Sequence, residues 1–192
     1  WEIINYVKKD KCPVIIFGME PFSSHLRLSN LKNFKYDWIY EKTEAKGHLN
    51  SKKQPLRAHE IISVFYGGCY NPQKTTGHVL KQANNVDRES KQSILYGKQK
   101  SVTSYSSTER YPRSVITFKT DKQKQNYHST QKPVALLEYL IKTYSNEGDT
   151  ILDFCMGSGT AGAAVKNLNR DFIGVELDYT YFAIAQTRLV NS

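Results

Sequence analysis

Cysteine is scarce in this sequence, which excludes the sites that depend on it. The 192 residues include three cysteines, Cys12, Cys69 and Cys155. Their spacing matches neither a zinc site nor the paired framework of a small secreted protein. The five histidines form no cluster with ligand spacing either. We therefore expect no structural metal and no disulfide, in a protein of the reducing cytoplasm.

Long apolar runs are also missing. No segment approaches the roughly 20 apolar residues that a membrane-spanning helix needs, and none has the pattern of a signal peptide. Hydrophobic residues still make up 39% of the chain, which is enough for one packed domain. We expect a soluble globular protein with no membrane partner.

Acidic residues are too few to balance the basic ones. The formal net charge is +9, and the excess is concentrated between Pro72 and Lys132, where 12 Lys and Arg accompany 4 Asp and Glu. Such a surplus suits contact with nucleic-acid phosphates. A solvated surface loop without any partner has the same composition. Charge alone leaves both alternatives open.

The first half of the chain alternates strand-like runs with polar connections. We expect helices within 1–10 and 21–33, and strands at 14–17, 36–40, 61–66 and 113–118. The apolar positions of the second helix are Phe22, Leu26, Leu28 and Leu31. Residues 71 to 111 are polar, without a sustained period, and too many for an ordinary connection, which indicates a functional or partly disordered segment.

Regular alternation of strands and helices returns after His128. A helix is predicted from about Pro133, capped by Ser129 or Thr130. Its single apolar stripe comprises Val134, Leu137, Leu140, Ile141 and Tyr144. A strand at 150–154, a helix to about 169, a strand at 172–176 and a last helix from about 178 follow. This β-α-β order implies a parallel sheet.

A glycine-rich turn lies inside this β-α-β unit. The segment 153–162 reads Asp-Phe-Cys-Met-Gly-Ser-Gly-Thr-Ala-Gly, which fits G-x-G-x-x-G, and Glu176 follows Gly157 by 19 residues. Such glycines let a ligand approach a helix N-terminus, and an acid at the end of the next strand can accept hydrogen bonds from ribose hydroxyls. A structural turn without a ligand is the alternative.

Asp153 discriminates between the two nucleoside cofactors that such a turn can bind. A carboxylate just before the glycines would repel the pyrophosphate of a dinucleotide, which needs a positive helix terminus. The same carboxylate can pair with the ammonium group of S-adenosylmethionine. Asp153 therefore favours S-adenosylmethionine and disfavours a nicotinamide-dependent oxidoreductase.

Three motifs follow one another along the chain: 128–133 (His-Ser-Thr-Gln-Lys-Pro), the glycine turn at 153–160, and 172–176 (Phe-Ile-Gly-Val-Glu). Together they resemble the permuted β-class of DNA amino-methyltransferases, found with restriction systems and in bacteriophages. Segments 14–18, 21–24, 36–42 and 54–60 are similar to phage members. The resemblance implies an α/β, Rossmann-like doubly wound sheet in circularly permuted order. It also implies methyl transfer from S-adenosylmethionine to adenine N6 or cytosine N4 of double-stranded DNA. The sequence leaves the choice of base open, and we take adenine as the first expectation.

The resemblance carries over to particular residues. The expected cofactor-binding residues are Ser129, Thr130, Gln131, Lys132, Asp153, Phe154, Gly157, Ser158, Gly159, Thr160 and Glu176. The expected DNA-binding residues, on a polar loop, are Lys52, Lys53, Arg57 and His59, although each is equally compatible with a plain surface charge. Residues 1–70 would belong to the catalytic sheet, 71–127 to a basic target-recognition segment, and 128–192 to the cofactor-binding region of the same domain.

The sequence departs from the family pattern in two places. Phe154-Cys155 replaces Pro-Phe after the aspartate. The catalytic Asp-Pro-Pro-Tyr is absent, and the family order places it upstream of Trp1, on the strand between the glycine-turn strand and the strand at 14–17. We therefore expect an incomplete, split sheet in an inactive part of a longer protein, or a homodimer or second chain that supplies the strand. A non-catalytic nucleic-acid-binding module is the alternative.

Overall fold

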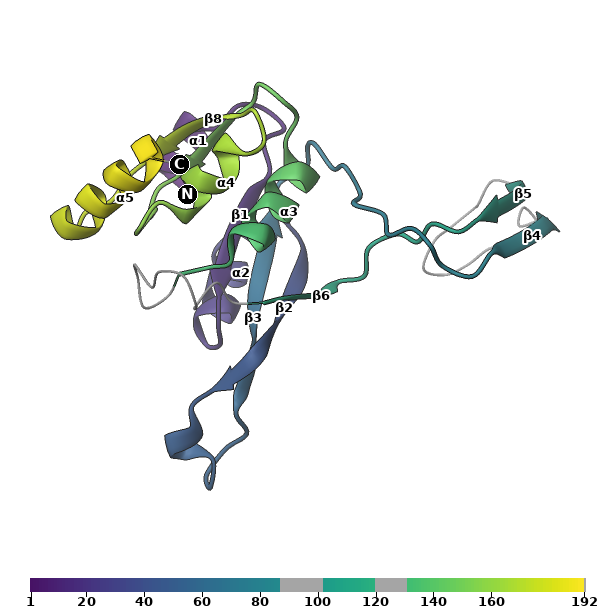
Figure 1. Ribbon diagram of the computed structural model, residues 1–192, viewed down its shortest axis with the longest axis horizontal. Coiled ribbons are helices and arrows are strands. Elements are labelled where there is room, and N and C mark those ends of the chain that lie inside the picture. Colours follow the sequence, from purple (N-terminus) through teal and green to yellow (C-terminus); the bar gives the residue numbers. More distant parts are fainter. Residues whose placement is uncertain (87–101, 120–130, 192) are drawn as a thin grey trace. The chain divides into compact units, whose positions relative to one another are not determined.

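The structure is a computed structural model that describes residues 1–86, 102–119 and 131–191. The chain divides into two compact units, Trp1–Asn71 with Arg113–Ser192, and Pro72–Pro112. The larger unit contains α1 (Glu2–Val7), β1 (Val14–Gly18), α2 (Phe22–Ser29), β2 (Phe34–Lys46), the 3-10 helix η1 (His48–Asn50), β3 (Arg57–Phe65), β6 (Val115–Phe118), α3 (Val134–Tyr144), β7 (Thr150–Asp153), α4 (Thr160–Lys166), β8 (Asp171–Gly174) and α5 (Tyr179–Asn191) (Figure 1). The smaller unit contains β4 (Lys81–Val86) and β5 (Val102–Ser107).

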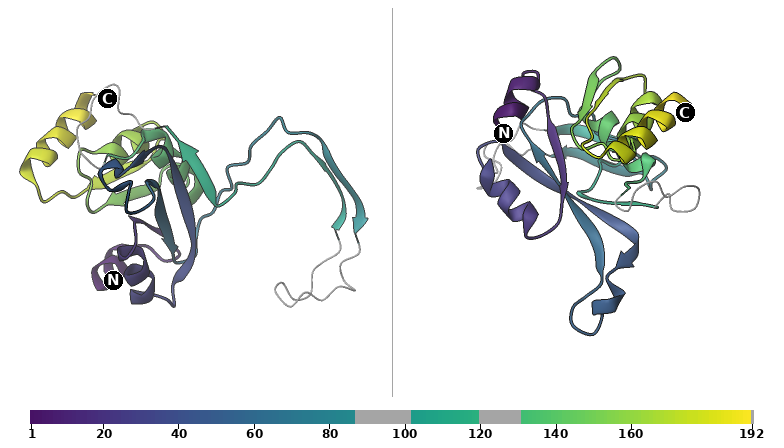
Figure 2. Two further views of the ribbon diagram at one scale, coloured as in Figure 1. Left: turned by 90° about the horizontal axis from the view of Figure 1, so that it is seen from below. Right: turned by 90° about the vertical axis from the view of Figure 1, so that its left-hand side faces the viewer.

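The first sheet has the strand order β1-β3-β2-β6. Strand β3 runs antiparallel to both neighbours, while β6 runs parallel to β2. The predicted strands are confirmed, but β2 continues beyond Tyr40 to Lys46 because its pairing with β3 continues, with Lys46 opposite Arg57. The β2–β3 hairpin consequently extends beyond the rest of the sheet (Figure 2).

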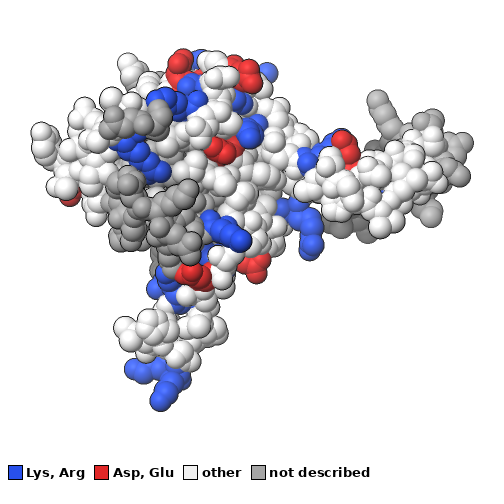
Figure 3. All heavy atoms as spheres, viewed as in Figure 1, with Lys and Arg blue, Asp and Glu red and all other residues white. Residues whose placement is uncertain are grey.

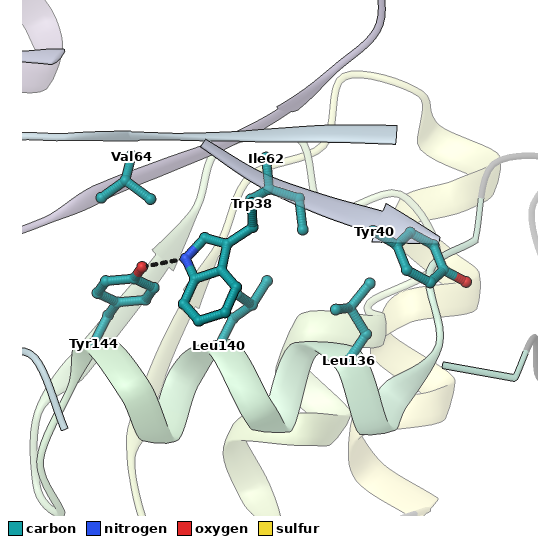
Figure 4. Close-up of a cluster of buried hydrophobic side chains, with 7 residues drawn as sticks. All are labelled: Trp38, Tyr40, Ile62, Val64, Leu136, Leu140 and Tyr144. Carbon is teal, nitrogen blue, oxygen red and sulfur yellow. Dashed lines mark hydrogen bonds between the residues drawn. The ribbon is translucent and has the colours of Figure 1, made fainter. Parts of the chain in front are cut away.

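Helix α3 packs through two faces rather than the single stripe that the sequence predicted. One face contacts the first sheet, and Figure 4 shows its side chains directed at the strands. This cluster comprises Trp38, Tyr40, Ile62, Val64, Leu136, Leu140 and Tyr144. The Tyr144 hydroxyl also accepts a hydrogen bond from Trp38 Nε1 at 2.5 Å (Figure 4). The other face, through Ile141, Val134 and Leu137, contacts α4 and the second sheet.

The start of α3 differs from the predicted capping. The helix begins at Val134 and its N-cap is Pro133, which has no side-chain cap. The predicted caps Ser129 and Thr130 lie outside the described residues, too far from Val134 in sequence to occupy the N-cap position.

The second sheet is the predicted β-α-β unit, because β7 and β8 pair in parallel with Thr150 opposite Asp171. Helix α4 connects them, and every residue from Thr160 to Val165 is buried. Its small side chains permit close packing. A Cβ added to Gly162 would lie 2.5 Å from Leu189 Cδ2 and 2.8 Å from Phe172 Cε1.

The two sheets of the larger unit are separate in the described residues. There, β1 pairs only with β3, and β7 pairs only with β8. A split sheet is what the sequence predicted; the identity of any strand between the pieces stays a prediction.

Helix α2 is shorter than the predicted range of 21–33, because a turn begins at Asn30, where the N–H of Asn33 donates to the Asn30 carbonyl at 3.1 Å. Three of its four expected apolar positions are exposed: Phe22, Leu28 and Leu31.

The smaller unit is a hairpin, which the sequence did not predict. Strands β4 and β5 pair antiparallel, with Lys81 opposite Ser107. An isolated bridge joins Thr75 to Arg110, and Lys74 forms an ion pair with Glu109 at 2.8 Å. These strands were not predicted because most of their residues are polar, so they lack the clear alternation of apolar and polar residues that indicates a strand.

The two-faced packing of α3 makes a stability prediction. Leu136 is completely buried against the first sheet, so Leu136→Ala should lower the free energy of unfolding by about 2–5 kcal/mol. The exposed Lys142 of the same helix is the control, and Lys142→Ala should change the free energy by less than about 0.5 kcal/mol. Urea denaturation measures both, and equal effects would contradict the assigned packing.

Candidate cofactor site at the glycine turn

The glycine turn joins the end of β7 to the start of α4. Gly157 and Gly159 adopt positive φ angles of 52° and 73°, which side chains rarely tolerate. The N–H of Gly159 donates to the Met156 carbonyl at 2.9 Å, and the N–H of Met156 donates to the Val175 carbonyl at 3.0 Å. The turn is thereby fixed to the segment that follows β8.

Glu176 lies directly on this turn, as its spacing predicted. Its Oε2 accepts a hydrogen bond from the Gly157 N–H at 2.8 Å, and its Oε1 accepts one from the Asp178 N–H at 3.0 Å. The backbone hydrogen bonds from Asp178 and Gly157 lower the pKa of Glu176. The side chain is therefore an ionised carboxylate, and each oxygen keeps a lone pair for a further donor such as a ribose hydroxyl.

Asp153 is the second carboxylate of the site, at the carboxyl end of β7. Burial raises its pKa, the negative charge of Glu176 raises it further, and a hydrogen bond from the Cys155 N–H at 3.1 Å acts in the opposite direction. Among the residues that the structure describes, no Lys, Arg or His forms an ion pair with Asp153. Partial burial of a carboxylate without a cation has a free-energy cost, so this position favours a positively charged ligand group.

Apolar side chains border the two carboxylates. Phe154 is half exposed and Leu177, next to Glu176, is fully exposed. Leu177 was not predicted from the sequence, because a single leucine before a helix has no distinguishing pattern. An exposed phenyl ring and an exposed leucine next to these acidic side chains suit the faces of an aromatic base.

Ser158 and Thr160 are buried within the turn rather than presented on the surface. The Thr160 hydroxyl accepts a hydrogen bond from Arg188 of α5 at 3.0 Å, whereas Ser158 Oγ has no hydrogen-bond partner among the described residues. Gly159 has a packing role as well, since an added Cβ would lie 3.0 Å from Ala185 Cβ. The glycines therefore shape the turn and also seat α5 against it.

Lys132, just before α3, points to the first sheet. Its Nζ lies 2.6 Å from Oε2 of Glu60, a buried residue of β3 that was not among the predicted site residues. Gln131 is half-buried beside it, while Ser129 and Thr130 lie outside the described residues. Within the predicted segment, Lys132 therefore has a charged partner in Glu60.

The four predicted DNA-binding residues all lie on the β2–β3 hairpin and not at the glycine turn (Figure 1). Lys52 and Lys53 follow η1, while Arg57 and His59 belong to β3, and all four are exposed. Basic side chains gather at the end of this hairpin in Figure 3. The hairpin thus presents positive charge to solvent at a distance from the cofactor turn.

Other kinds of site are not found in the described residues. They contain no cluster of three or more potential metal ligands, and no helix among them has the length and apolarity to cross a bilayer. All three cysteines are free thiols.

A family model described as DNA methylase matches residues 2–187. The chain belongs to this family. Two curated relatives are type II methyltransferases. M2.DpnII from Streptococcus pneumoniae is 50% identical over 62 residues, which are 32% of this chain and 23% of that protein. M.HpaI from Haemophilus parainfluenzae is 48% identical over 62 residues, which are 32% of this chain and 20% of that protein. The matched segments thus span about a fifth of the relatives' length.

Solved structures of DNA methylases have the same fold. The crystal structure of the M1.HpyAVI–SAM complex is 24% identical, with a TM-score of 0.69, and the match covers 97% of this chain and 78% of that one. The PvuII DNA methyltransferase, described as cytosine-N4-specific, is 15% identical, with a TM-score of 0.61 and coverage of 94% and 64%. The Rossmann-like α/β fold predicted from the sequence is confirmed.

The raised pKa of Asp153 predicts a stability change with a definite sign. Because folding disfavours the ionised carboxylate, ionised Asp153 lowers the free energy of unfolding at pH values above the ordinary carboxyl pKa. This loss of stability disappears as the pH falls below that pKa. Asp153→Asn removes that charge and keeps an oxygen for the Cys155 N–H. The variant should be more stable than the wild type near neutral pH, by about 1 kcal/mol or less, and should match it below about pH 4.

Urea denaturation at the two pH values measures this difference. A variant that is less stable than the wild type at neutral pH would show that Asp153 already has a stabilising partner in the free protein.

Proposed function

We propose that this protein is part of a site-specific DNA methyltransferase, which transfers a methyl group from S-adenosylmethionine to the exocyclic amino group of adenine (N6) or cytosine (N4) in duplex DNA in the cytoplasm. Membership of the DNA methylase family supports the reaction class. The observation that carries the cofactor assignment is the partly buried carboxylate of Asp153, which has no cation among the described residues, beside the ionised Glu176.

The residues of the turn fit the chemical groups of S-adenosylmethionine. Asp153 would pair with the ammonium group, and Glu176 would accept hydrogen bonds from the ribose hydroxyls. Phe154 and Leu177 would contact the two faces of the adenine. Ser158 Oγ, which is buried and has no hydrogen-bond partner in the described part of the chain, is a further polar atom near the glycines.

The same charges disfavour a dinucleotide. A pyrophosphate at the start of α4 would approach both Asp153 and Glu176, and no Lys or Arg is paired with either carboxylate in the described residues. Phosphate sites at helix N-termini depend on the positive end of the helix dipole, which two nearby carboxylates oppose. The related M1.HpyAVI, in contrast, has been crystallised as a complex with SAM.

The methyl-accepting side of the reaction requires residues beyond these. S-adenosylmethionine, when bound, supplies an electrophilic methyl group on a sulfonium centre. The acceptor is an amino group of a flipped base, whose position must be fixed by hydrogen bonds and stacking. We propose that an Asp-Pro-Pro-Tyr segment outside these 192 residues, or from a second chain, performs that task. The unpaired edges of β1 and β7 in the described sheets are consistent with an added strand, and the isolated chain should then be inactive.

DNA contacts are proposed for the basic surface of the hairpin and for the basic segment 71–127. Lys52, Lys53, Arg57 and His59 are exposed, and cations on such a surface bind phosphates without reading the sequence. Adenine N6 is the first acceptor to test. Cytosine N4 is the second, because a structure with the same fold is described as cytosine-N4-specific.

Calorimetric titration tests the cofactor assignment. The protein should bind S-adenosylmethionine and not NAD. Asp153→Asn and Glu176→Gln should each weaken binding by about tenfold or more, since each removes a charge-assisted hydrogen bond. The exposed Glu147 provides a matched control, and Glu147→Gln should leave the dissociation constant unchanged. A protein that binds NAD but does not bind S-adenosylmethionine would contradict the cofactor assignment.

The full-length protein then decides whether the cofactor is used. Transfer of labelled methyl groups to duplex DNA, followed by nucleoside analysis, identifies N6-methyladenine or N4-methylcytosine. Binding of cofactor and DNA with no transfer would instead favour a non-catalytic nucleic-acid-binding module.

A further inference from the structure

A buried carboxylate with two lysines lies at the carboxyl end of β1. Glu60 Oε1 is 2.5 Å from Lys42 Nζ, and Glu60 Oε2 is 2.6 Å from Lys132 Nζ. The exposed fractions of the three side chains are 11%, 16% and 23%. We call Lys42, Glu60 and Lys132 the lysine–glutamate triad. Each member comes from a different segment: β2, β3 and the residues before α3.

The strand register fixes where the triad lies. Gly18, the last residue of β1, pairs with Ile61, so Glu60 is one residue beyond the end of that strand, opposite Tyr40 of β2. Lys132 Nζ also lies 5.3 Å from the centroid of the Phe17 ring. The carboxyl ends of strands are where ligands bind in open α/β sheets. The triad therefore occupies the functional edge of the sheet.

The triad is electrostatically connected to the glycine turn. Burial raises the pKa of the Cys155 thiol, the neighbouring Asp153 raises it further, and the positive charge of Lys132 acts in the opposite direction. The charge of Lys132 thus acts on the thiol of the turn as well as on the carboxylate of Glu60.

The charges of the triad do not cancel. One carboxylate accompanies two ammonium groups, which leaves one net positive charge on side chains that are mostly buried. The pKa of Glu60 is lowered: burial acts to raise it, but the hydrogen bonds and charges of Lys132 and Lys42 outweigh that effect. The carboxylate is therefore ionised. A surplus charge in a partly buried place favours a ligand that brings one negative charge.

We infer that Lys42 is a positioning residue that neutralises Glu60, so that the charge of Lys132 remains available to bind the single carboxylate of a ligand. Glu60 fixes Lys132 at the edge of the sheet, and Lys42 prevents Glu60 from cancelling the charge of Lys132. The inference rests on the proposed function, in which that carboxylate belongs to the methionine end of S-adenosylmethionine. It adds two residues, Lys42 and Glu60, to those that the sequence indicated.

The test compares two ligands that differ at the methionine end. S-adenosylmethionine carries the carboxylate, whereas 5′-methylthioadenosine has the same adenosine and lacks the amino-acid group. Lys42→Met leaves Glu60 and Lys132 as a neutral pair. It should weaken S-adenosylmethionine binding by about tenfold and change methylthioadenosine binding by less than about twofold. Lys35→Met removes an exposed lysine from the opposite end of β2 and should change neither.

A double variant separates charge from structure. Lys42→Met with Glu60→Gln restores one net positive charge, on Lys132 alone, and should recover S-adenosylmethionine binding to within about threefold of the wild type. A purely structural role predicts that the double variant binds no better than Lys42→Met. Recovery would support the inference. Equal losses for both ligands, or no recovery, would overturn it.

The binding experiments distinguish an error in the proposed function from an error in the role of the lysine–glutamate triad. If the wild type binds S-adenosylmethionine but Lys42→Met binds it equally well, only the role of the triad is wrong. If the wild type binds neither ligand, the proposed function is wrong, and the inference about the triad, which rests on it, is wrong as well. Circular dichroism of each variant confirms that the fold is retained before affinities are compared.

Discussion

The packing of α3 between two sheets is the constraint on which the rest of the larger unit depends. Its Leu136, Leu140 and Tyr144 are buried against the first sheet, while Ile141 contacts α4 and the second sheet. In the described residues no strand joins the sheets, so this helix provides the main apolar connection between them. Because Lys132 lies just before the helix, the same packing holds its ammonium group on Glu60 of the first sheet.

Charge is distributed around the turn in a consistent pattern. Asp153 and Glu176 bring negative charge to the end of the β7–β8 sheet, and the surplus of the lysine–glutamate triad brings positive charge from the other sheet. A ligand that carries an ammonium, a carboxylate and a ribose complements all three features. A phosphate alone does not, because it lacks a cation for Asp153, and a dinucleotide would bring its pyrophosphate close to both carboxylates. The site is therefore better explained by charge complementarity than by the glycine motif, since Gly159 and Gly162 also have packing roles.

The sequence predicted the parts of the fold that local pattern determines. The β-α-β unit, the turn and the placement of Glu176 follow from glycine spacing and apolar runs, and the structure has them. The triad could not be predicted, because Lys42, Glu60 and Lys132 are far apart in sequence and meet only through strand register and helix packing. The two faces of α3 were missed for the same reason. The helical periodicity of apolar residues indicates that a helix has an apolar side, but it does not indicate that two separate sheets pack against that side. Strands β4 and β5 were missed because most of their residues are polar.

The central claim is that the partly buried carboxylate of Asp153, which has no cation among the described residues, selects a cationic cofactor group. A crystal structure of the protein with S-adenosylmethionine tests it most directly. The account predicts the cofactor's ammonium within hydrogen-bond distance, about 3 Å, of the Asp153 carboxylate, and the ribose hydroxyls on Glu176. A cofactor bound with its ammonium in solvent, or with Asp153 facing no positive group, would contradict the account.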